Sequence, residues 1–364
     1  MVVRSSSNHD SIILKCRSDL ARDPCNVDAL IDITNSLVHL CRYEEAIEVY
    51  ERAGADGIHH PYITASAGKA LLGFGDYGRG WRLYDAHREI IPQRNYDVAV
   101  WRGEPIGGKT VLIHGEQGFG DTIQFLRYLP LIADLGAKIV LEVYRELVVL
   151  AKSSFRDTTI ISRGEAFERL DFHCPTFSLP AAFGTTLDTI PQQTFLCPPP
   201  TRIARWQSSL PPSPRIGLAW STNPANYDSL VRSIPTRALK PLLQVQGAAF
   251  VSVQREVPSF SELRELPALL PLGSAFGNFA DVAAVISQLD LVITADTAIA
   301  HVAGAMHKPV WVLLPFYSDW KWMRERDSSP WYPSARLFRQ PAPGDWESTM
   351  KQVSKALKSF IAAQ

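Results

Sequence analysis

A helical repeat region followed by two α/β lobes is the fold class that this sequence predicts. Three observations support it: a pattern that recurs after 34 residues near the start of the chain, two separate series of alternating strands and helices, and a proline-rich stretch between them. At 364 residues the chain exceeds the roughly 250–300 residues at which a single core stops growing. We therefore expect more than one domain.

The repeat is visible when Tyr43 and Ala46 are aligned with Tyr77 and Gly80, 34 residues later. This offset is the period of tetratricopeptide (TPR) repeats, which are pairs of helices, and we assign residues 1–95 to a TPR-like region. Two repeats are fewer than the three or so that an independent solenoid needs, so we expect them to pack against another domain. They are either a docking surface for an acceptor or a structural cap, and both interpretations stay open.

Residues 100–200 predict a first Rossmann-like lobe. Apolar runs indicate strands at residues 111–113, 138–143, 159–162 and 170–174, with helices over 122–135 and 146–152. Alternation of this kind is typical of a mostly parallel sheet covered by helices.

A second series follows the proline-rich residues 191–214 and predicts another Rossmann-like lobe over residues 212–345. Its expected strands are 215–220, 249–254, 291–294 and 310–314, its expected helices are 236–245, 281–288 and 298–305, and a C-terminal helix should occupy 346–364. Two lobes joined by a linker predict an interdomain cleft, where active sites commonly lie.

Composition narrows the class of protein. Lys plus Arg and Asp plus Glu are equal at 37 each, so no basic footprint predicts a nucleic-acid partner. The five cysteines are odd in number and lack C-x-x-C spacing, which is typical of reduced thiols. No signal-peptide pattern and no apolar run of about 20 residues is visible, so we expect a cytoplasmic protein without a membrane span.

The most informative segment is a glycine-containing turn between an apolar run and an amphipathic helix. Gly115, Gln117, Gly118 and Gly120 form the expected loop, and the helix is expected to open at Asp121. Backbone N–H groups at such a junction attract anions, and open α/β sheets bind ligands at the carboxyl ends of their strands. The G-x-x-G-x-G spacing differs from the dinucleotide fingerprint, which disfavours an NAD enzyme.

Asp121 itself has two interpretations. It is either a carboxylate at the lip of a small-molecule site or the cap of its helix, with Gln124 three residues later completing a capping-box-like pair.

A second cluster follows the predicted strand 291–294. Asp296 and Thr297 stand at the start of a helix, and His301 falls on the same face four residues later. The Thr297 hydroxyl, the N–H groups of Ala298 and Ile299, and His301 can converge on one anionic group, for which a diphosphate fits best. Because the Asp296 carboxylate would repel it, we assign that side chain to holding the loop or binding a ligand hydroxyl. The alternative is a capped core helix.

Three further features complete the candidate set. Arg232 lies in a polar loop and can pair with phosphate oxygens in bidentate fashion. Glu256 follows a strand and is a candidate ligand for a ribose hydroxyl. Three tryptophans, Trp320, Trp322 and Trp331, crowd one segment and either stack on a sugar or base or pack in the core.

Together these motifs resemble bacterial TPR glycosyltransferases whose C-terminal region is similar to the ADP-heptose:lipopolysaccharide heptosyltransferases, glycosyltransferase family 9, with the GT-B fold. G-E-Q-G-F-G-D matches the family's N-terminal loop, whose Asp is the proposed catalytic base, and Asp121 takes that place. A-D-T-A-I-A-H-V-A-G-A resembles its donor-phosphate motif D-[ST]-G-x-x-H-x-x-A-A, which carries over to Asp296, Thr297 and His301. Ala298 stands where the family has glycine.

The family's phosphate-binding lysine in the second-lobe loop is not evident, and Arg232 is our substitute for it. A carboxylate near a helix N-terminus is stabilised in its charged form and is a weaker base, so Glu116 and His114 of the same loop are alternative bases.

The resemblance implies an inverting glycosyltransferase that moves a sugar from a nucleoside-diphosphate sugar to a hydroxyl of a protein or glycan acceptor, the TPR-like repeats helping to dock it. The chain contains no Asp-x-Asp, so we expect no metal and no cofactor. Two alternatives stay open: a catalytically inactive TPR/GT-B binding or adaptor protein, and a nucleotide-sugar epimerase, which would need no acceptor.

Overall fold

The computed structural model describes residues 6–91, 94, 96–167, 169–223, 229–255 and 264–363. The chain forms two compact units. The first comprises Met1–Gly103, Phe177–Ile190 and Tyr317–Arg326, and the second comprises Glu104–Thr176, Pro191–Phe316 and Asp327–Gln364. Two segments far along the chain therefore belong with the N-terminal residues, outside the region 1–95 that the sequence pattern delimits.

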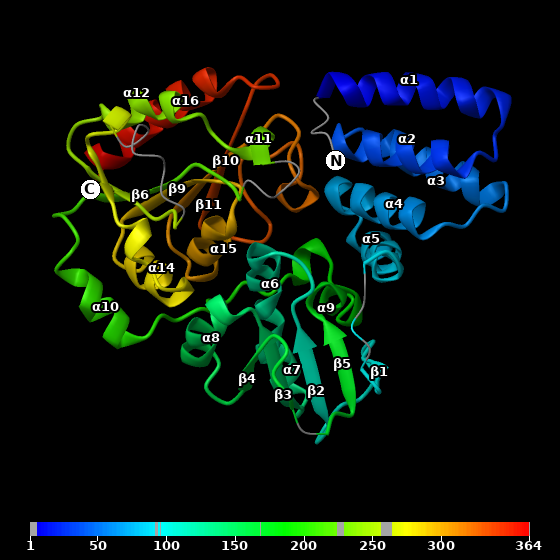
Figure 1. The fold of residues 1–364 in the computed structure, drawn as a ribbon, viewed down its shortest axis with the longest axis horizontal. Coiled ribbons are helices and arrows are strands. Elements are labelled where there is room, and N and C mark those ends of the chain that lie inside the picture. The colour runs from blue at the N-terminus through cyan, green and yellow to red at the C-terminus, as the bar shows by residue number, and fades with distance from the viewer. Residues whose placement is uncertain are drawn as a thin grey trace. The chain divides into compact units, whose positions relative to one another are not determined.

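Helices make up most of the first unit. They are α1 (Ser6–Arg22), α2 (Val27–His39), α3 (Tyr43–Ala55), α4 (Pro61–Phe74), α5 (Tyr77–Tyr84) and the 3₁₀ helix η1 (Asp85–Glu89), followed by the short strand β1 (Ala99–Val100) (Figure 1). The starts of α2 and α4 are 34 residues apart, as are those of α3 and α5. The repeat in the sequence thus corresponds to two successive helix pairs.

Small residues set the spacing within these pairs. Ala46 of α3 is fully buried, and Gly80 takes the equivalent place in α5. A Cβ at Gly80 would lie 2.8 Å from Leu72 Cδ2, and one at Gly68 would lie 2.4 Å from the backbone N of Tyr84. Helices α4 and α5 therefore pack at a distance that only glycine permits at these positions.

The segment Tyr317–Arg326 packs onto the helices of the first unit. Its 3₁₀ helix η8 (Trp320–Trp322) places the Trp320 ring edge-on to Trp81, with ring centroids 5.4 Å apart. Arg324 Nη1 donates to the carbonyl of Cys41 at 3.2 Å. Trp320 and Trp322 are buried here, and Trp331 is buried in the second unit. The tryptophans are therefore core residues, and the predicted stacking on a sugar or base is wrong for them.

The second unit contains two parallel sheets. In the first, β2 (Thr110–His114), β3 (Lys138–Val143), β4 (Thr159–Ser162) and β5 (Phe172–Pro175) lie in the order β5-β2-β3-β4. Strands β3 and β4 have the predicted bounds, because each is a short apolar run with β-branched residues.

The single helix predicted over residues 122–135 is wrong. The chain forms α6 (Phe119–Phe125), the 3₁₀ helix η2 (Leu126–Tyr128) and α7 (Leu129–Asp134). Pro130 stands in the first turn of α7, where its missing N–H costs nothing, whereas inside a continuous helix it would break a hydrogen bond. Helix α8 (Val148–Ser154) follows β3, and α9 (Leu179–Ala182) belongs to the first unit.

Six parallel strands form the second sheet in the order β11-β10-β9-β6-β7-β8, of which Figure 1 labels β6, β9, β10 and β11. They are β6 (Arg215–Ala219), β7 (Ala249–Ser252), β8 (Leu269–Pro271), β9 (Leu291–Ala295), β10 (Val310–Leu314) and β11 (Ala335–Arg339). Strands β8 and β11 were not predicted, since their apolar runs are short or interrupted by arginine.

The helices of this lobe are α10 (Pro200–Gln207), α11 (Ser229–Arg232), α12 (Lys240–Leu243), α14 (Phe279–Ile286), α15 (Ala298–Ala305) and α16 (Trp346–Ala362). The helix expected over 236–245 is instead a 3₁₀ turn, η6 (Thr236–Leu239), followed by α12. Alternate side chains of β6 and β9, such as Ile216 and Leu291, share a buried core with Val353 and Leu357 of α16. No helix of the described ranges is long and apolar enough to cross a membrane.

Candidate functional site

The junction between β2 and α6 is a tight turn that depends on glycine. Gly118 is the N-cap of α6 in an extended conformation and provides no side-chain cap. The Thr122 hydroxyl donates to the Gly118 carbonyl at 3.0 Å, which folds the Thr122 side chain back over the turn. A Cβ at Gly115 would lie 2.6 Å from Thr122 Oγ1, so glycine is required there. Gly120 lies inside the helix rather than in the expected loop.

Asp121 is the third residue of α6 and is half-buried. The interpretation of Asp121 as the helix cap is wrong, because Gly118 occupies the capping position and Gln124 is fully buried. A Cβ at Gly118 would lie 3.3 Å from Asp121 Oδ2. The carboxylate therefore lies back over the turn, at its lip.

The other residues of the loop are held by neighbouring elements. The Tyr144 hydroxyl donates to the carbonyl of Gln117, and Glu116 and Gln117 are half-buried. His114 is buried at the end of β2, where its Nε2 lies 3.1 Å from His173 Nδ1. His114 is thus turned toward the neighbouring strand β5, which makes it a poorer candidate base than Glu116 or Asp121.

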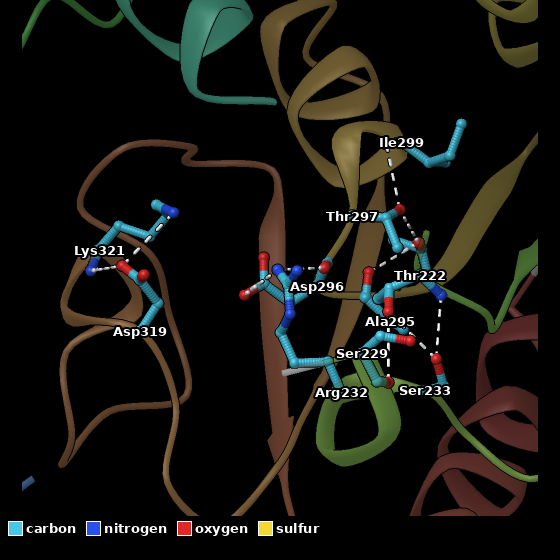
Figure 2. A network of polar contacts seen from close by, with 11 residues as sticks. Thr222, Ser229, Arg232, Ser233, Ala295, Asp296, Thr297, Ile299, Asp319 and Lys321 are labelled. Carbon is cyan, nitrogen blue, oxygen red and sulfur yellow. Dashed lines mark hydrogen bonds and ion pairs between the residues drawn. The ribbon is translucent and has the colours of Figure 1, made fainter. Parts of the chain in front are cut away.

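The junction between β9 and α15 carries the second cluster (Figure 2). Thr297 is the N-cap of α15, and its hydroxyl accepts from Ile299 N at 3.2 Å. The Thr294 hydroxyl, fully buried, lies 3.2 Å from that of Thr297 and supports it. The Ile299 N–H, which we expected to face a ligand, is thus used by the cap. Ala298, half-buried, begins the helix.

Arg232 and Asp296 contact each other rather than standing apart. Arg232 Nη1 donates to the backbone carbonyl of Asp296 at 3.2 Å and lies 3.6 Å from Asp296 Oδ2 (Figure 2). The Asp296 side chain is buried, with 3% of its surface exposed, so the pair anchors α11 to the start of α15. This is the loop-holding role expected for Asp296. The binding of phosphate by Arg232 stays a prediction.

The two predicted motifs meet at His301. A Cβ at Gly120 would lie 2.7 Å from His301 Cδ2, 3.3 Å from His301 Nε2 and 3.4 Å from the Cα of Ala298. Helices α6 and α15 therefore pack against each other at the glycine, which brings the loop of the first lobe beside the cluster of the second. The rings of Phe119 and Phe279 also meet, with centroids 5.1 Å apart.

Sequence reasoning missed Tyr332. Its hydroxyl lies 2.8 Å from Nδ1 of the buried His301. No spacing rule links residues 31 positions apart in different elements, and the aromatic segment around Tyr332 drew attention only to its tryptophans. Glu256 lies outside the described residues, while the nearby Gln254 accepts from the N–H of Trp220 at 3.0 Å and so ties β6 to β7.

Residues 276–339 match the sequence model of the family described as Glycosyltransferase family 9 (heptosyltransferase). That stretch includes Asp296, Thr297, His301 and Tyr332, the residues that form the second-lobe side of the site. The match is confined to this part of the second lobe. The matched residues therefore include the cluster at the start of α15.

One curated relative and two solved structures show what else the chain is similar to. The chain is 30% identical over 326 residues to protein FlbA of Caulobacter vibrioides, a match covering 80% of this chain and 54% of FlbA. It therefore spans about half the length of this relative. The family 9 glycosyl transferase of Veillonella parvula has 10% identity and a TM-score of 0.55, over 72% of this chain and 100% of that one.

A second similar structure is ADP-heptose lps heptosyltransferase II of E. coli, with 14% identity and a TM-score of 0.47 over 70% of this chain and 99% of that one. The Veillonella likeness and the parallel sheets show a GT-B-like α/β glycosyltransferase fold.

Proposed function

We propose that this protein is an inverting, metal-independent glycosyltransferase that moves a sugar from a nucleoside-diphosphate sugar to a hydroxyl of a protein or glycan. The observation that carries the proposal is the contact of Gly120 with His301. Asp121, a half-buried carboxylate, follows Gly120 in the chain, so this contact supports a base in the first lobe acting on a donor bound at the start of α15.

The residues divide into two roles in this mechanism. Asp121 takes the proton of the acceptor hydroxyl as that oxygen attacks the anomeric carbon, with Glu116 as the alternative base. The nucleoside diphosphate leaves on the opposite side, and its growing negative charge is met by the N-terminus of α15, by His301 and by Arg232. Attack opposite to the leaving group inverts the anomeric centre.

Fixed positive groups support the proposal of metal independence. Arg232, at the end of α11, contacts Asp296 just before α15 and carries a permanent charge, and the N-terminus of α15 adds a partial positive charge. Together they can balance a diphosphate in the way a divalent cation otherwise does. The sequence lacks the Asp-x-Asp pattern that would bind such a cation.

The helical repeats are the proposed docking site for the acceptor. A groove of about 430 Å³ lies among α1, α2 and α3 of the first unit. Its lining combines apolar side chains such as Leu20 and Ile33 with charged ones such as Glu48 and Arg52. A mixed lining of this kind suits a polypeptide, and a protein acceptor would bind there.

The first experiment is a thermal-shift screen with UDP, GDP, ADP and CMP sugars, followed by transfer assays with the nucleotide sugar that binds. A donor at about 100 times its dissociation constant should stabilise the protein by ~2.7 kcal/mol. Asp121→Asn should lower turnover by roughly 10²–10⁴-fold because it removes the base, while the thermal shift is kept.

The matched control is Glu116→Gln, which neutralises the other carboxylate of the loop. If Glu116→Gln abolishes turnover and Asp121→Asn does not, Glu116 is the base. Donor binding without transfer or hydrolysis in the wild type would favour the inactive binding or adaptor protein. A sugar-nucleotide isomer formed without acceptor would identify an epimerase.

A further inference from the structure

His301 is fixed by contacts on both sides of its ring. Its Nδ1 lies 2.8 Å from the Tyr332 hydroxyl, and the two rings meet edge to face, with centroids 5.6 Å apart and planes at 71°. Its Nε2 is on the side of Gly120, where an added Cβ would be only 3.3 Å away. The ring therefore presents its Cδ2–Nε2 edge to Gly120, in the first turn of α6.

Tyr332 is in turn enclosed between a glycine and a cation. A Cβ at Gly304 of α15 would lie 2.4 Å from the Tyr332 ring, so the ring rests directly on the helix backbone. The guanidinium carbon of Arg127 also lies close to this ring, 4.8 Å from the Tyr332 ring centroid. Arg127 is buried, with 1% of its surface exposed, so its charge acts on the phenol with little screening by water.

Backbone carbonyls hold Arg127 in this place. Its Nε donates to the Gln124 carbonyl at 2.8 Å, and its Nη1 donates to the carbonyls of Trp331 at 2.7 Å and Pro191 at 3.1 Å. These acceptors come from the first lobe, the linker and the loop before β11. The cation beside Tyr332 is thus positioned by all three segments.

A neutral histidine carries one ring proton, and the partner of one nitrogen decides where that proton sits. If the Tyr332 hydroxyl donates to Nδ1, the proton of His301 must be on Nε2. The positive charge of Arg127 favours this direction, because it polarises the phenol O–H of Tyr332 toward donation.

We propose that Tyr332 is a positioning residue that fixes the tautomer of His301, so that Nε2–H faces the Gly118–Gly120 turn and donates to the departing diphosphate. Arg127 reinforces this hydrogen bond from the Tyr332 ring. The inference rests on the proposed function for the identity of the anion, although the tautomer itself can be measured without any substrate.

The first test is ¹⁵N NMR of the full chain labelled at histidine, without nucleotide. The ¹⁵N signals of His301 are assigned by their absence in His301→Gln. In the wild type they should show an unprotonated Nδ1 and a protonated Nε2. Tyr332→Phe removes only the hydroxyl and should give a mixture of tautomers. Nδ1–H in the wild type, or an unchanged tautomer in Tyr332→Phe, would overturn the proposal whatever the protein's activity.

Tyr128→Phe is the matched control, since Tyr128 is also fully buried in the second unit and the same atom is removed. It should keep the wild-type tautomer. In the transfer assay, Tyr332→Phe should lower kcat about tenfold with KM for the donor nearly unchanged, because the Nε2–H bond strengthens as the diphosphate leaves.

Equal losses of kcat in Tyr332→Phe and Tyr128→Phe, with the tautomer unaltered, would assign the effect to packing and refute the positioning role. If the wild type transfers no sugar at all, the proposed function fails while the NMR result still decides whether Tyr332 sets the tautomer. Arg127→Met should shift the tautomer toward the mixture seen in Tyr332→Phe, and a wild-type tautomer in that variant would remove Arg127 from the proposal.

Discussion

The two sheets of the second unit are alike where their first strands begin and differ at the candidate site. In each sheet, the first N–H of the first strand in this unit, β2 or β6, donates to an aspartate next to a neighbouring strand: Thr110 N donates to Asp171 at 2.8 Å, and Arg215 N donates to Asp290 at 2.6 Å. At the candidate site, β2 leads into α6 through glycine without a side-chain cap, whereas β9, which pairs with β6, leads into α15 through a capping threonine.

This difference separates two tasks. The glycine junction supplies space, because the missing Cβ atoms let α6 approach His301 and let Thr122 fold over the turn. The capped junction supplies fixed polar groups, because Thr297 and the Arg232–Asp296 pair hold the start of α15 in one geometry. Variants that fill the space or remove the polar groups should therefore fail in different ways.

The largest effect is expected from filling the glycine junction. In Gly120→Ala the new Cβ would meet His301 Cδ2 at 2.7 Å, so α6 and α15 must move apart. Alanine normally stabilises a helix relative to glycine, yet we expect a loss of about 1–3 kcal/mol in the free energy of unfolding from overpacking. Turnover should fall roughly 10²-fold, because the base and the donor site are displaced. Denaturant unfolding and transfer assays measure the two losses.

Gly107→Ala is the control for this variant, because its Cβ would meet only the Leu135 carbonyl at 3.6 Å. It should change stability by less than about 1 kcal/mol. Unchanged turnover in Gly120→Ala would show that close approach of the helices is not needed for catalysis.

The same contrast explains what sequence could predict. Strands β3, β4 and β10 and helix α15 match their predicted bounds, because each is set by a local signal: an apolar run or a threonine cap. Helix α6 lacks such a signal. Gly118 begins it without a side-chain bond, and the apolar pattern continues across Pro130, so the break before α7 was invisible to periodicity.

The candidate site residues also divide into those that a local sequence signal places and those that only tertiary structure brings together. Asp296 and Thr297 could be placed because a strand and a cap adjoin them, whereas the contact of His301 with Tyr332 joins elements that only tertiary structure brings together. The sequence predicted only that the motif of each lobe lies at a common cleft, and not that Gly120 contacts His301. Its cause, the absence of a side chain at one helical position, became visible in three dimensions.

After the combined loss of stability and turnover in Gly120→Ala, the next largest effect is expected from breaking the ion pair of the capped junction. Arg232→Met removes the hydrogen bond to the Asp296 carbonyl and leaves a buried carboxylate without its cation. We expect a loss of about 1.5–3 kcal/mol in the free energy of unfolding, the usual range for hydrogen bonds to charged groups. Arg232→Lys should recover only part of it, since a lysine lacks the planar fork.

Arg237→Met is a control for Arg232→Met, because Arg237 is an exposed arginine of the following 3₁₀ turn. It should leave stability within about 0.5 kcal/mol of the wild type. If Arg232→Met is as stable as this control but binds the nucleotide sugar more weakly, the guanidinium serves the ligand and not the loop.

A smaller loss is expected when the cap alone is removed. Thr297→Ala deletes the hydroxyl that accepts from Ile299 N at 3.2 Å, which should cost about 1 kcal/mol of unfolding free energy. Thr297→Ser keeps the hydroxyl and should restore most of it. Thermal unfolding of both variants measures the difference, and equal melting temperatures would mean that the cap contributes nothing to α15.

The smallest effect is expected at the hydrogen bond between Thr110 N and Asp171, which both sheets share in form. The N–H of Thr110, with further help from Lys109, lowers the pKa of the Asp171 carboxyl, an effect that its partial burial opposes. A carboxyl whose pKa is lower in the folded state stabilises the protein above its unfolded pKa of about 3.9, and this contribution disappears as the pH falls through the folded value. Asp171→Asn cannot titrate, so its melting temperature should fall less than that of the wild type between pH 7 and pH 3. An identical fall in the melting temperature of both proteins would show that the charge at Asp171 adds nothing to the hydrogen bond from Thr110. The same comparison of the wild type with Asp290→Asn would show whether the stability of the second sheet depends on Asp290 in the same way.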